Sequence, residues 1–190
     1  MKINVIDVEA TCWERPTNIP SEIIQIGISQ LDTNRRDENG RRGYISPPFS
    51  VFVKPLSSFS LSPFCRELTG LTDEQVFGEG ILFAEALALL DEKYELSKIP
   101  WASWGDYDRA MMVRMSERDM IRPPLSNQHL NAKTMFFLMT NRRCGAVTAV
   151  EDVLKMEWVG RNHDGGDDAY NTARILRELI PHTSQTKKLI

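Results

Sequence analysis

Two acidic residues, Asp7 and Glu9, stand near the end of the first predicted strand. The run from Ile3 to Val8 is short and largely β-branched, which is typical of a strand that is buried on both faces. Because side chains alternate along a strand, both carboxylates point to the same face, with their Cα atoms roughly 6.5 Å apart. Such a pair is either solvated at the strand tip or binds a hard cation, since Mg²⁺ and Mn²⁺ take carboxylate oxygens as ligands.

Further acidic residues follow two later apolar elements. Asp106 and Asp108 lie where a predicted strand at residues 99–104 passes into a helix, so each is either a helix cap or a member of the same site. Nearer the C-terminus, His163 precedes Asp168 by five residues, and two glycines lie between them. A flexible loop of this length would let the imidazole lie over a carboxylate that is fixed in the first turn of a helix.

Taken in chain order, these residues resemble the motif set of the DEDDh 3′-5′ exonucleases, which have the ribonuclease H-like fold. The finer detail is similar to the Eri-like or KapD-like branch of that family, and the similarity extends from Val5 to Ala173. Gln25 departs from the pattern, because that branch usually has a glutamate at this position. The position has a structural role in the family. Four short segments carry the resemblance: Asp7 to Glu14 (DVEATCWE), Glu22 to Gly27 (EIIQIG), Leu68 to Thr72 (LTGLT) and Gly160 to Ala169 (GRNHDGGDDA).

The resemblance implies a site with two Mg²⁺ or Mn²⁺ ions and a histidine general base. Asp108 is chosen over Asp106 because Tyr107 and Asp108 match the aromatic-Asp pair of the family. Asp168 is chosen over Asp167 because its spacing from the histidine and the alanine after it match, which leaves Asp167 as a helix cap. The metal ligands implied are Asp7, Glu9, Asp108 and Asp168, and the implied base is His163.

The physical chemistry agrees with these roles. Cleavage of a phosphodiester needs a nucleophile made from water and neutralisation of charge on the attacking and leaving oxygens, and a pair of metal ions supplies both. A neutral imidazole has a pKa suited to taking the proton from that water.

The loop after Glu9 leaves the predicted metal site beside the expected position of the terminal sugar. Trp13 is the candidate for stacking on a terminal base, with a plain packing role as the alternative. Arg161 and Lys133 are candidate phosphate contacts, with solvated surface charge as the alternative. The substrate-binding residues predicted from this loop are Ala10, Thr11, Cys12 and Trp13.

The expected substrate is the 3′ end of single-stranded nucleic acid, RNA with DNA tolerated, and the expected products are nucleoside 5′-monophosphates. One alternative is a non-catalytic nucleic-acid-binding module, which the loss of an acid would favour, but all four acids are present. The other is a DNA proofreading or repair exonuclease subunit that acts with a polymerase. A long docking tail would favour it, whereas only residues 181–190 follow the last predicted helix.

Composition limits the class of protein further. Of the 190 residues, 42% are apolar and 26% are charged, which is ordinary for a globular domain. The net charge of −3 is unusual for a protein that binds duplexes through a basic surface, although an acid cluster that holds cations contributes to it. Cys12, Cys65 and Cys144 lack zinc-type spacing, which predicts reduced thiols. No apolar segment is long enough to span a bilayer and no leader opens the chain, so we expect a cytoplasmic protein without membrane contact or an obligate protein partner.

A single α/β domain must bring these residues together. We expect a ribonuclease H-like mixed five-stranded sheet flanked by helices over residues 1–180, no domain before it, and a loose tail at 181–190. Strands are predicted near 2–14, 22–31, 44–54, 99–104 and 129–133, with an exposed hairpin turn at 32–42 and a kink or split at Pro47-Pro48. Helices are predicted near 63–70, 80–96, 108–117 and 134–141, after a capping box at Thr148 to Glu151, and from about Asp167.

Overall fold

A mixed sheet organises the structure, and its central strand is β1 (Lys2–Ala10). In this computed structural model, which describes residues 1–180, β1 pairs antiparallel with β2 (Ile23–Arg36) and parallel with β5 (Trp101–Ser103). The strand order is β3-β2-β1-β5-β6, and β4 also pairs with β2. The remaining strands are β3 (Arg42–Ile45), β4 (Phe49–Phe52) and β6 (His129–Asn131).

The sheet has six strands where five were expected. The predicted strand at 44–54 splits into β3 and β4, which pair with different parts of β2. Pro47 and Pro48 lie between them, and proline cannot donate a hydrogen bond to a ladder. The hairpin turn is also shorter than predicted, because β2 continues to Arg36 and the chain reverses over residues 37–41. The first strand ends at Ala10, before the predicted residue 14.

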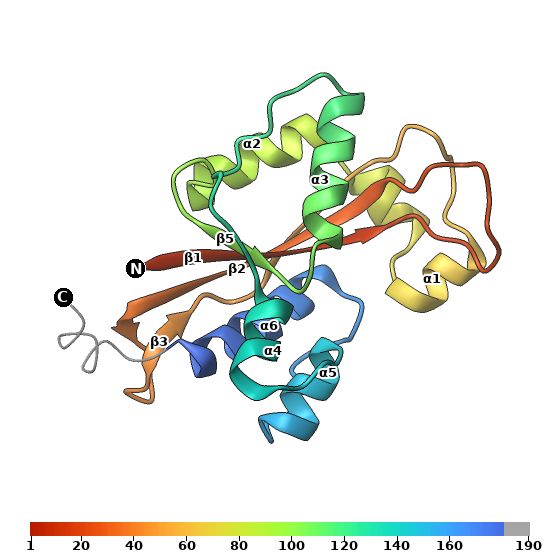
Figure 1. The fold of residues 1–190 in the computed structure, drawn as a ribbon. Helices are drawn as coiled ribbons and strands as arrows, with labels where there is room; N and C mark the ends of the chain where they lie inside the picture. Colours follow the sequence, from red (N-terminus) through yellow and green to blue (C-terminus); the bar gives the residue numbers. More distant parts are fainter. Residues whose placement is uncertain (181–190) are drawn as a thin grey trace.

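Helices cover both faces of the sheet (Figure 1). The helices α2 and α3 lie over one face, and α4 and α6 lie over the other. The α-helices are α1 (Pro63–Thr69), α2 (Phe83–Tyr94), α3 (Tyr107–Arg118), α4 (Ala132–Thr140), α5 (Ala146–Thr148) and α6 (Gly165–Leu179). Two short π-helical turns, η1 (Glu74–Glu79) and η2 (Ala149–Val153), complete the order of elements.

The core is divided by β1, as the alternation of its side chains predicts. Ile6 and Val8 pack in the cluster that includes α2 and α3, whereas Ile3 and Val5 pack with Ala173 of α6. Asp7 and Glu9 therefore start from the α6 side of the sheet, at the end of the strand.

Four helix starts differ from the prediction, and the smaller corrections are that α2 begins at Phe83 rather than near residue 80 and α4 at Ala132 rather than near residue 134. The helix expected after the capping box begins at Ala146 instead, and Thr148 makes no capping hydrogen bond. The turn that follows is π-helical, which the local pattern does not reveal, and η1 was not predicted at all. The last helix begins at Gly165, two residues before the expected start, because Asp164 caps it.

The described part of the chain contains no helix that is long and apolar enough to cross a membrane. The three cysteines are free thiols, as predicted. The tail predicted at 181–190 lies outside the described residues.

Candidate active site

The carboxyl end of β1 opens into a cavity of about 490 Å³. Asp7 and Glu9 line it from β1, and the side chain of Glu9 is largely buried at 8% exposure. The other acids and the histidine come from segments distant in sequence. They are Asp108 from α3, His163 from the loop before α6 and Asp168 from α6.

Asp108 reaches the cavity because α3 begins directly after β5, which lies beside β1 in the sheet. Its Oδ1 accepts a hydrogen bond from the Val8 N–H at 3.0 Å, which ties the start of α3 to β1. Asp106, the rejected alternative, is exposed and accepts a hydrogen bond from the Asn131 side chain at 2.8 Å. The structure thus brings Asp108 rather than Asp106 to the other acids.

The start of α6 positions Asp168 in the first turn. The cap is Asp164, whose Oδ1 accepts from the backbone N–H groups of Gly166 and Asp167. The prediction that Asp167 caps this helix is therefore wrong. Asp167 instead accepts a hydrogen bond from the Arg161 N–H at 2.7 Å, because it lies in the first turn of the helix and faces back to the preceding loop.

Close packing holds α6 against β2. A Cβ atom at Gly27 would lie 1.9 Å from the Gly165 carbonyl carbon, so only glycine permits this contact. Gln25 stabilises the same contact between β2 and α6. Its side-chain carbonyl accepts from the Gly165 N–H at 2.8 Å, and its amide donates to Asp164 at 3.1 Å. The glutamine that departs from the family pattern therefore binds the cap of the helix that carries Asp168.

The loop that carries His163 is also fastened at several points. Asn171 is fully buried and its amide donates to the Val159 carbonyl at 2.8 Å. The Arg161 guanidinium donates to the carbonyls of Glu67 and Leu68 at the end of α1. His163 itself has a φ of 64°, a left-handed conformation that is uncommon outside glycine, and its N–H donates to Asp168 Oδ2 at 3.3 Å.

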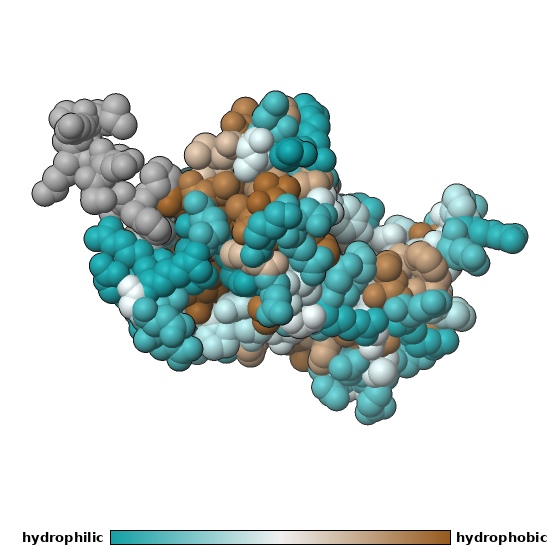
Figure 2. Space-filling model, turned by 90° about the horizontal axis from the view of Figure 1, so that it is seen from below, coloured by the Kyte–Doolittle hydropathy of each residue, from teal (hydrophilic) through white to brown (hydrophobic). Residues whose placement is uncertain are grey.

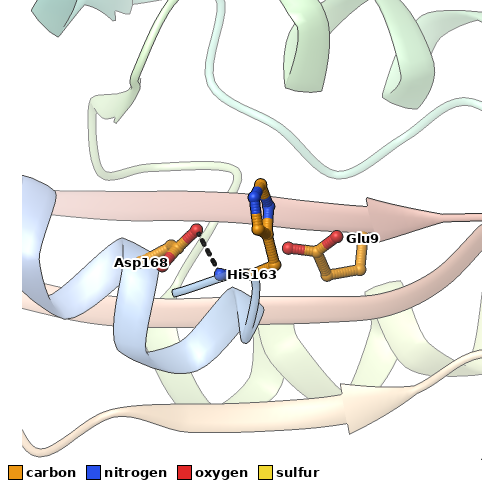
Figure 3. Close-up of side chains that lie close together, drawn as sticks. All are labelled: Glu9, His163 and Asp168. Carbon is orange, nitrogen blue, oxygen red and sulfur yellow. Dashed lines mark hydrogen bonds between the residues drawn. The ribbon is translucent and has the colours of Figure 1, made fainter. Parts of the chain in front are cut away.

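The imidazole of His163 lies between the carboxylates of Asp168 and Glu9, as Figure 3 shows. One ligand atom from each of these three side chains lies within 4.8 Å of the others. A single metal ion, or a water molecule on one, has donor atoms of suitable type and spacing there.

Burial and mutual repulsion make this cluster electrostatically unfavourable on its own. Burial raises the pKa of Glu9 to about 8 and that of Asp168 to about 7, and neighbouring carboxylates add to both shifts. Burial also raises the pKa of Asp108 to about 6, although the Val8 N–H opposes that shift. The pKa of Asp7 is raised well above its usual range by burial, and the Asp108 carboxylate adds to the shift.

These acids fit a divalent cation. Asp168 Oδ1 is buried and has no hydrogen-bond partner among residues 1–180, although buried carboxylate oxygens are normally satisfied. A cation would both satisfy this oxygen and restore the charged form of the carboxylates.

Only part of the predicted substrate loop, Ala10 to Trp13, lines the cavity. Ala10 and Cys12 line the cavity. Thr11 is buried, and its hydroxyl accepts a hydrogen bond from the Glu22 N–H at 2.9 Å. Its side chain therefore links the end of β1 to the start of β2. Trp13 is half-buried and is not among the residues that line the cavity.

Several cavity residues were not predicted from the sequence. Tyr107, 56% exposed at the start of α3, is an aromatic side chain at the cavity. Its position next to Asp108 is the signal that could have identified it. The others are uncharged and have no chemical signature of their own: Leu68, Trp104, Gly145, Ala146, Val147, Thr148, Asn162 and Thr172.

This combination of fold and acid cluster is that of the ribonuclease H-like exonuclease structures. The structure aligns with the nuclease domain of 3'hExo, a DEDDh family member solved with rAMP bound, at a TM-score of 0.80 and 27% identity. That alignment covers 94% of this chain and 90% of the other. The family model described as Exonuclease matches residues 4–176, and the chain belongs to the DEDDh 3′-5′ exonuclease family.

Two curated relatives are similar over nearly the whole chain. Human 3'-5' exoribonuclease 1 is 30% identical over 190 residues, which cover 94% of this chain and 52% of the relative. ERI1 exoribonuclease 2 of Xenopus laevis is 26% identical over 199 residues, covering 93% of this chain and 28% of the relative. The chain thus spans about half the length of the first and little more than a quarter of the second.

Proposed function

We propose that this protein is a metal-dependent 3′-5′ exonuclease that hydrolyses phosphodiester bonds at single-stranded 3′ ends and releases nucleoside 5′-monophosphates. RNA is the expected substrate, with DNA tolerated. The proposal rests on one observation above the rest: four acids and a histidine, from four separate segments, meet in one cavity. One buried carboxylate oxygen there has no hydrogen-bond partner within residues 1–180.

The acids Asp7, Glu9, Asp108 and Asp168 would hold two Mg²⁺ or Mn²⁺ ions. Bound there, the ions supply an activated water at neutral pH and offset the charge on the attacking and leaving oxygens. The carboxylates are held rigidly for this purpose, Asp108 by the Val8 N–H and Asp168 by the His163 N–H.

His163 is the proposed general base. Its imidazole lies between Glu9 and Asp168, so it is placed to take the proton of a water molecule held among these acids (Figure 3). General-base catalysis by a positioned histidine contributes about 10²–10⁴ in rate. The hydrogen bonds of Asn171 and Arg161 hold the loop that carries His163, and the left-handed backbone at His163 sets the direction in which its side chain leaves the loop.

The terminal nucleotide would enter the cavity beside Ala10 and Cys12, with Tyr107 and Leu68 on its walls. Trp13 stays a proposed stacking residue from the sequence, and Tyr107 joins it on the basis of its exposure. RNA is preferred in this proposal because relatives that are similar over nearly the whole chain include proteins named as exoribonucleases. A 2′-hydroxyl contact near the Ala10 to Cys12 loop would distinguish RNA from DNA.

The test is the cleavage of matched single-stranded RNA and DNA oligonucleotides, each labelled at its 5′ end, with Mg²⁺ or Mn²⁺. We expect a ladder that shortens from the 3′ end, faster on RNA, and no cleavage with chelator. Internal cuts as the first products, or cleavage that persists with chelator, would contradict the proposal. A large DNA preference would instead favour the repair or proofreading alternative and leave the metal chemistry intact.

A further inference from the structure

A second concave surface lies next to the active-site cavity. We call it the α4–α5 groove; it encloses about 570 Å³ and is lined by Lys133, Thr134, Phe137, Leu138, Arg143 and Cys144. The side of the molecule that carries α4, α5 and α6 has apolar areas bordered by hydrophilic surface (Figure 2). No residue of this groove is among the proposed catalytic groups.

The groove and the cavity adjoin each other. Cys144 lines the groove, and the next residue, Gly145, lines the cavity. Trp104 lines the cavity while its ring packs at 5.6 Å, edge to face, on Phe136 of α4. Because β1, β5 and β6 are parallel, their carboxyl ends meet at one edge of the sheet, and Lys133 follows β6 at that edge.

The charges of the two surfaces are opposite. Lys133, Arg142 and Arg143 are exposed, and none of them forms an ion pair with a carboxylate within the described part of the chain. Lys133 lies in the first turn of α4, where a cation is disfavoured by the helix dipole. Helix stability therefore does not explain a lysine at this position, whereas the binding of an anionic ligand would explain it.

The groove also offers an aromatic face and apolar contacts. The Arg143 guanidinium lies 4.3 Å from the centroid of the Phe137 ring, which holds the cation at the groove while leaving its N–H donors free to bind. Leu138 beside it is 74% exposed. A cationic track with aromatic side chains is the composition that binds single-stranded nucleic acid without sequence preference.

We infer that the α4–α5 groove binds the phosphodiester chain upstream of the scissile nucleotide. This inference rests on the proposed function, because the strand must lead from the groove over Cys144 and Gly145 into the acidic cavity. Lys133 and Arg143 bind its phosphates, and Phe137 and Leu138 contact its bases. Of the two phosphate contacts predicted from the sequence, Lys133 is assigned to this track. Arg161 is not, because its guanidinium is engaged with the carbonyls of Glu67 and Leu68.

The experiment compares Lys133→Gln/Arg143→Gln with Lys2→Gln. Lys2 is the control, because it is also exposed but lies at the opposite end of β1 from Glu9. Binding of a 5′-fluorescein-labelled RNA ten-mer is measured by fluorescence anisotropy with Mg²⁺ over a series of salt concentrations. All proteins carry His163→Ala, so binding is read whether or not the chain cleaves RNA. Cleavage is measured separately in proteins that retain His163.

We expect the double variant to weaken ten-mer binding on the order of tenfold, and to reduce the slope of log K against log salt by about 0.7 for each cation removed. The KM for a ten-mer should rise more than that for a dinucleotide, because a dinucleotide has no phosphodiester upstream of the scissile one. Lys2→Gln should match its parent, and the melting temperature of the double variant should not fall.

Equal ten-mer affinity and salt slope in the double variant and the control would overturn the inference, whether or not the protein cleaves RNA. Equal losses for the dinucleotide and the ten-mer would also overturn it. A chain that binds the ten-mer through the groove but cleaves no oligonucleotide with Mg²⁺ or Mn²⁺ would leave the groove assignment standing and refute the proposed activity.

Discussion

Two buried glutamates, Glu22 and Glu9, lie at the same end of the sheet but differ in the charges around them. Glu22, 1% exposed, accepts from the Leu56 and Ser57 N–H groups at 3.0 and 2.7 Å and is paired with the Arg118 guanidinium. Glu9, 8% exposed, is surrounded by other carboxylates, and its pKa is raised to about 8. The fold pairs the first with a guanidinium, whereas Glu9 forms no ion pair among residues 1–180, and this contrast is the one expected between a structural carboxylate and a proposed metal ligand.

The largest effect expected from this comparison is on catalysis. Asp7→Asn should reduce cleavage on the order of 10⁴-fold, because a metal pair supplies several kcal/mol of charge stabilisation. The melting temperature without metal should not fall, since the substitution removes one charge from a repelling cluster. Initial rates and thermal melts with chelator measure the two effects. An inactive variant that is also unfolded would place Asp7 with Glu22 as a structural carboxylate.

His163→Ala should be slower by about 10²–10⁴ in kcat while retaining metal and substrate binding. The reason is that the proposed base takes part in the reaction, whereas the acids around it are proposed to hold the cations. Single-turnover rates and calorimetric titration with Mn²⁺ separate the two properties. Full activity near pH 7 would show that His163 is not the base.

The opposite result is expected at the structural glutamate. Glu22→Ala should lower the free energy of unfolding by about 2–4 kcal/mol, because two backbone N–H groups lose their acceptor and Arg118 loses its partner. The Glu22→Gln variant keeps an acceptor and should lose less. Denaturant unfolding gives both values. A loss of activity in Glu22→Ala that exceeds its loss of folded protein would mean that Glu22 also serves the active site.

The smallest effect is a pH dependence of stability. The folded state raises the pKa of Glu9 to about 8 and of Asp168 to about 7, above the unfolded values of about 4. The folded protein therefore binds more protons than the unfolded chain between pH 4 and 8, so these groups make the free energy of unfolding fall as pH rises.

We accordingly expect the melting temperature with chelator to drop by several degrees between pH 5.5 and 8. Mg²⁺ should stabilise the protein more at pH 8 than at pH 5.5, because fewer protons then compete with the ion for the carboxylates. Asp168→Asn is the matched control, and its melting temperature should drop less over the same pH range. Parallel curves for wild type and Asp168→Asn would indicate that these carboxylates do not have raised pKa values.

The sequence alone sufficed for the family, the mixed sheet and the membership of the acid cluster. Local patterns indicated the candidate acids, namely a β-branched run that ends in Asp7 and Glu9, and a histidine five residues before Asp168 at a helix start. The family, and the choice of Asp108 and Asp168 over their neighbours, came from the resemblance of the motifs to known exonucleases. Such signals depend on residue spacing within one strand or one helical turn, which backbone geometry determines. The proposed roles of these residues and of the Ala10 to Trp13 loop stay predictions.

Only the tertiary structure decided the features that depend on contacts between distant segments. It selected Asp164 over Asp167 as the cap, turned Thr11 toward Glu22, and paired the two halves of the third strand with different parts of β2. It also placed Lys133 and Arg143 beside the acidic cavity. The physical reason is that a capping bond, a buried hydroxyl or a charged groove depends on which side chains meet across the fold, and sequence spacing does not encode that.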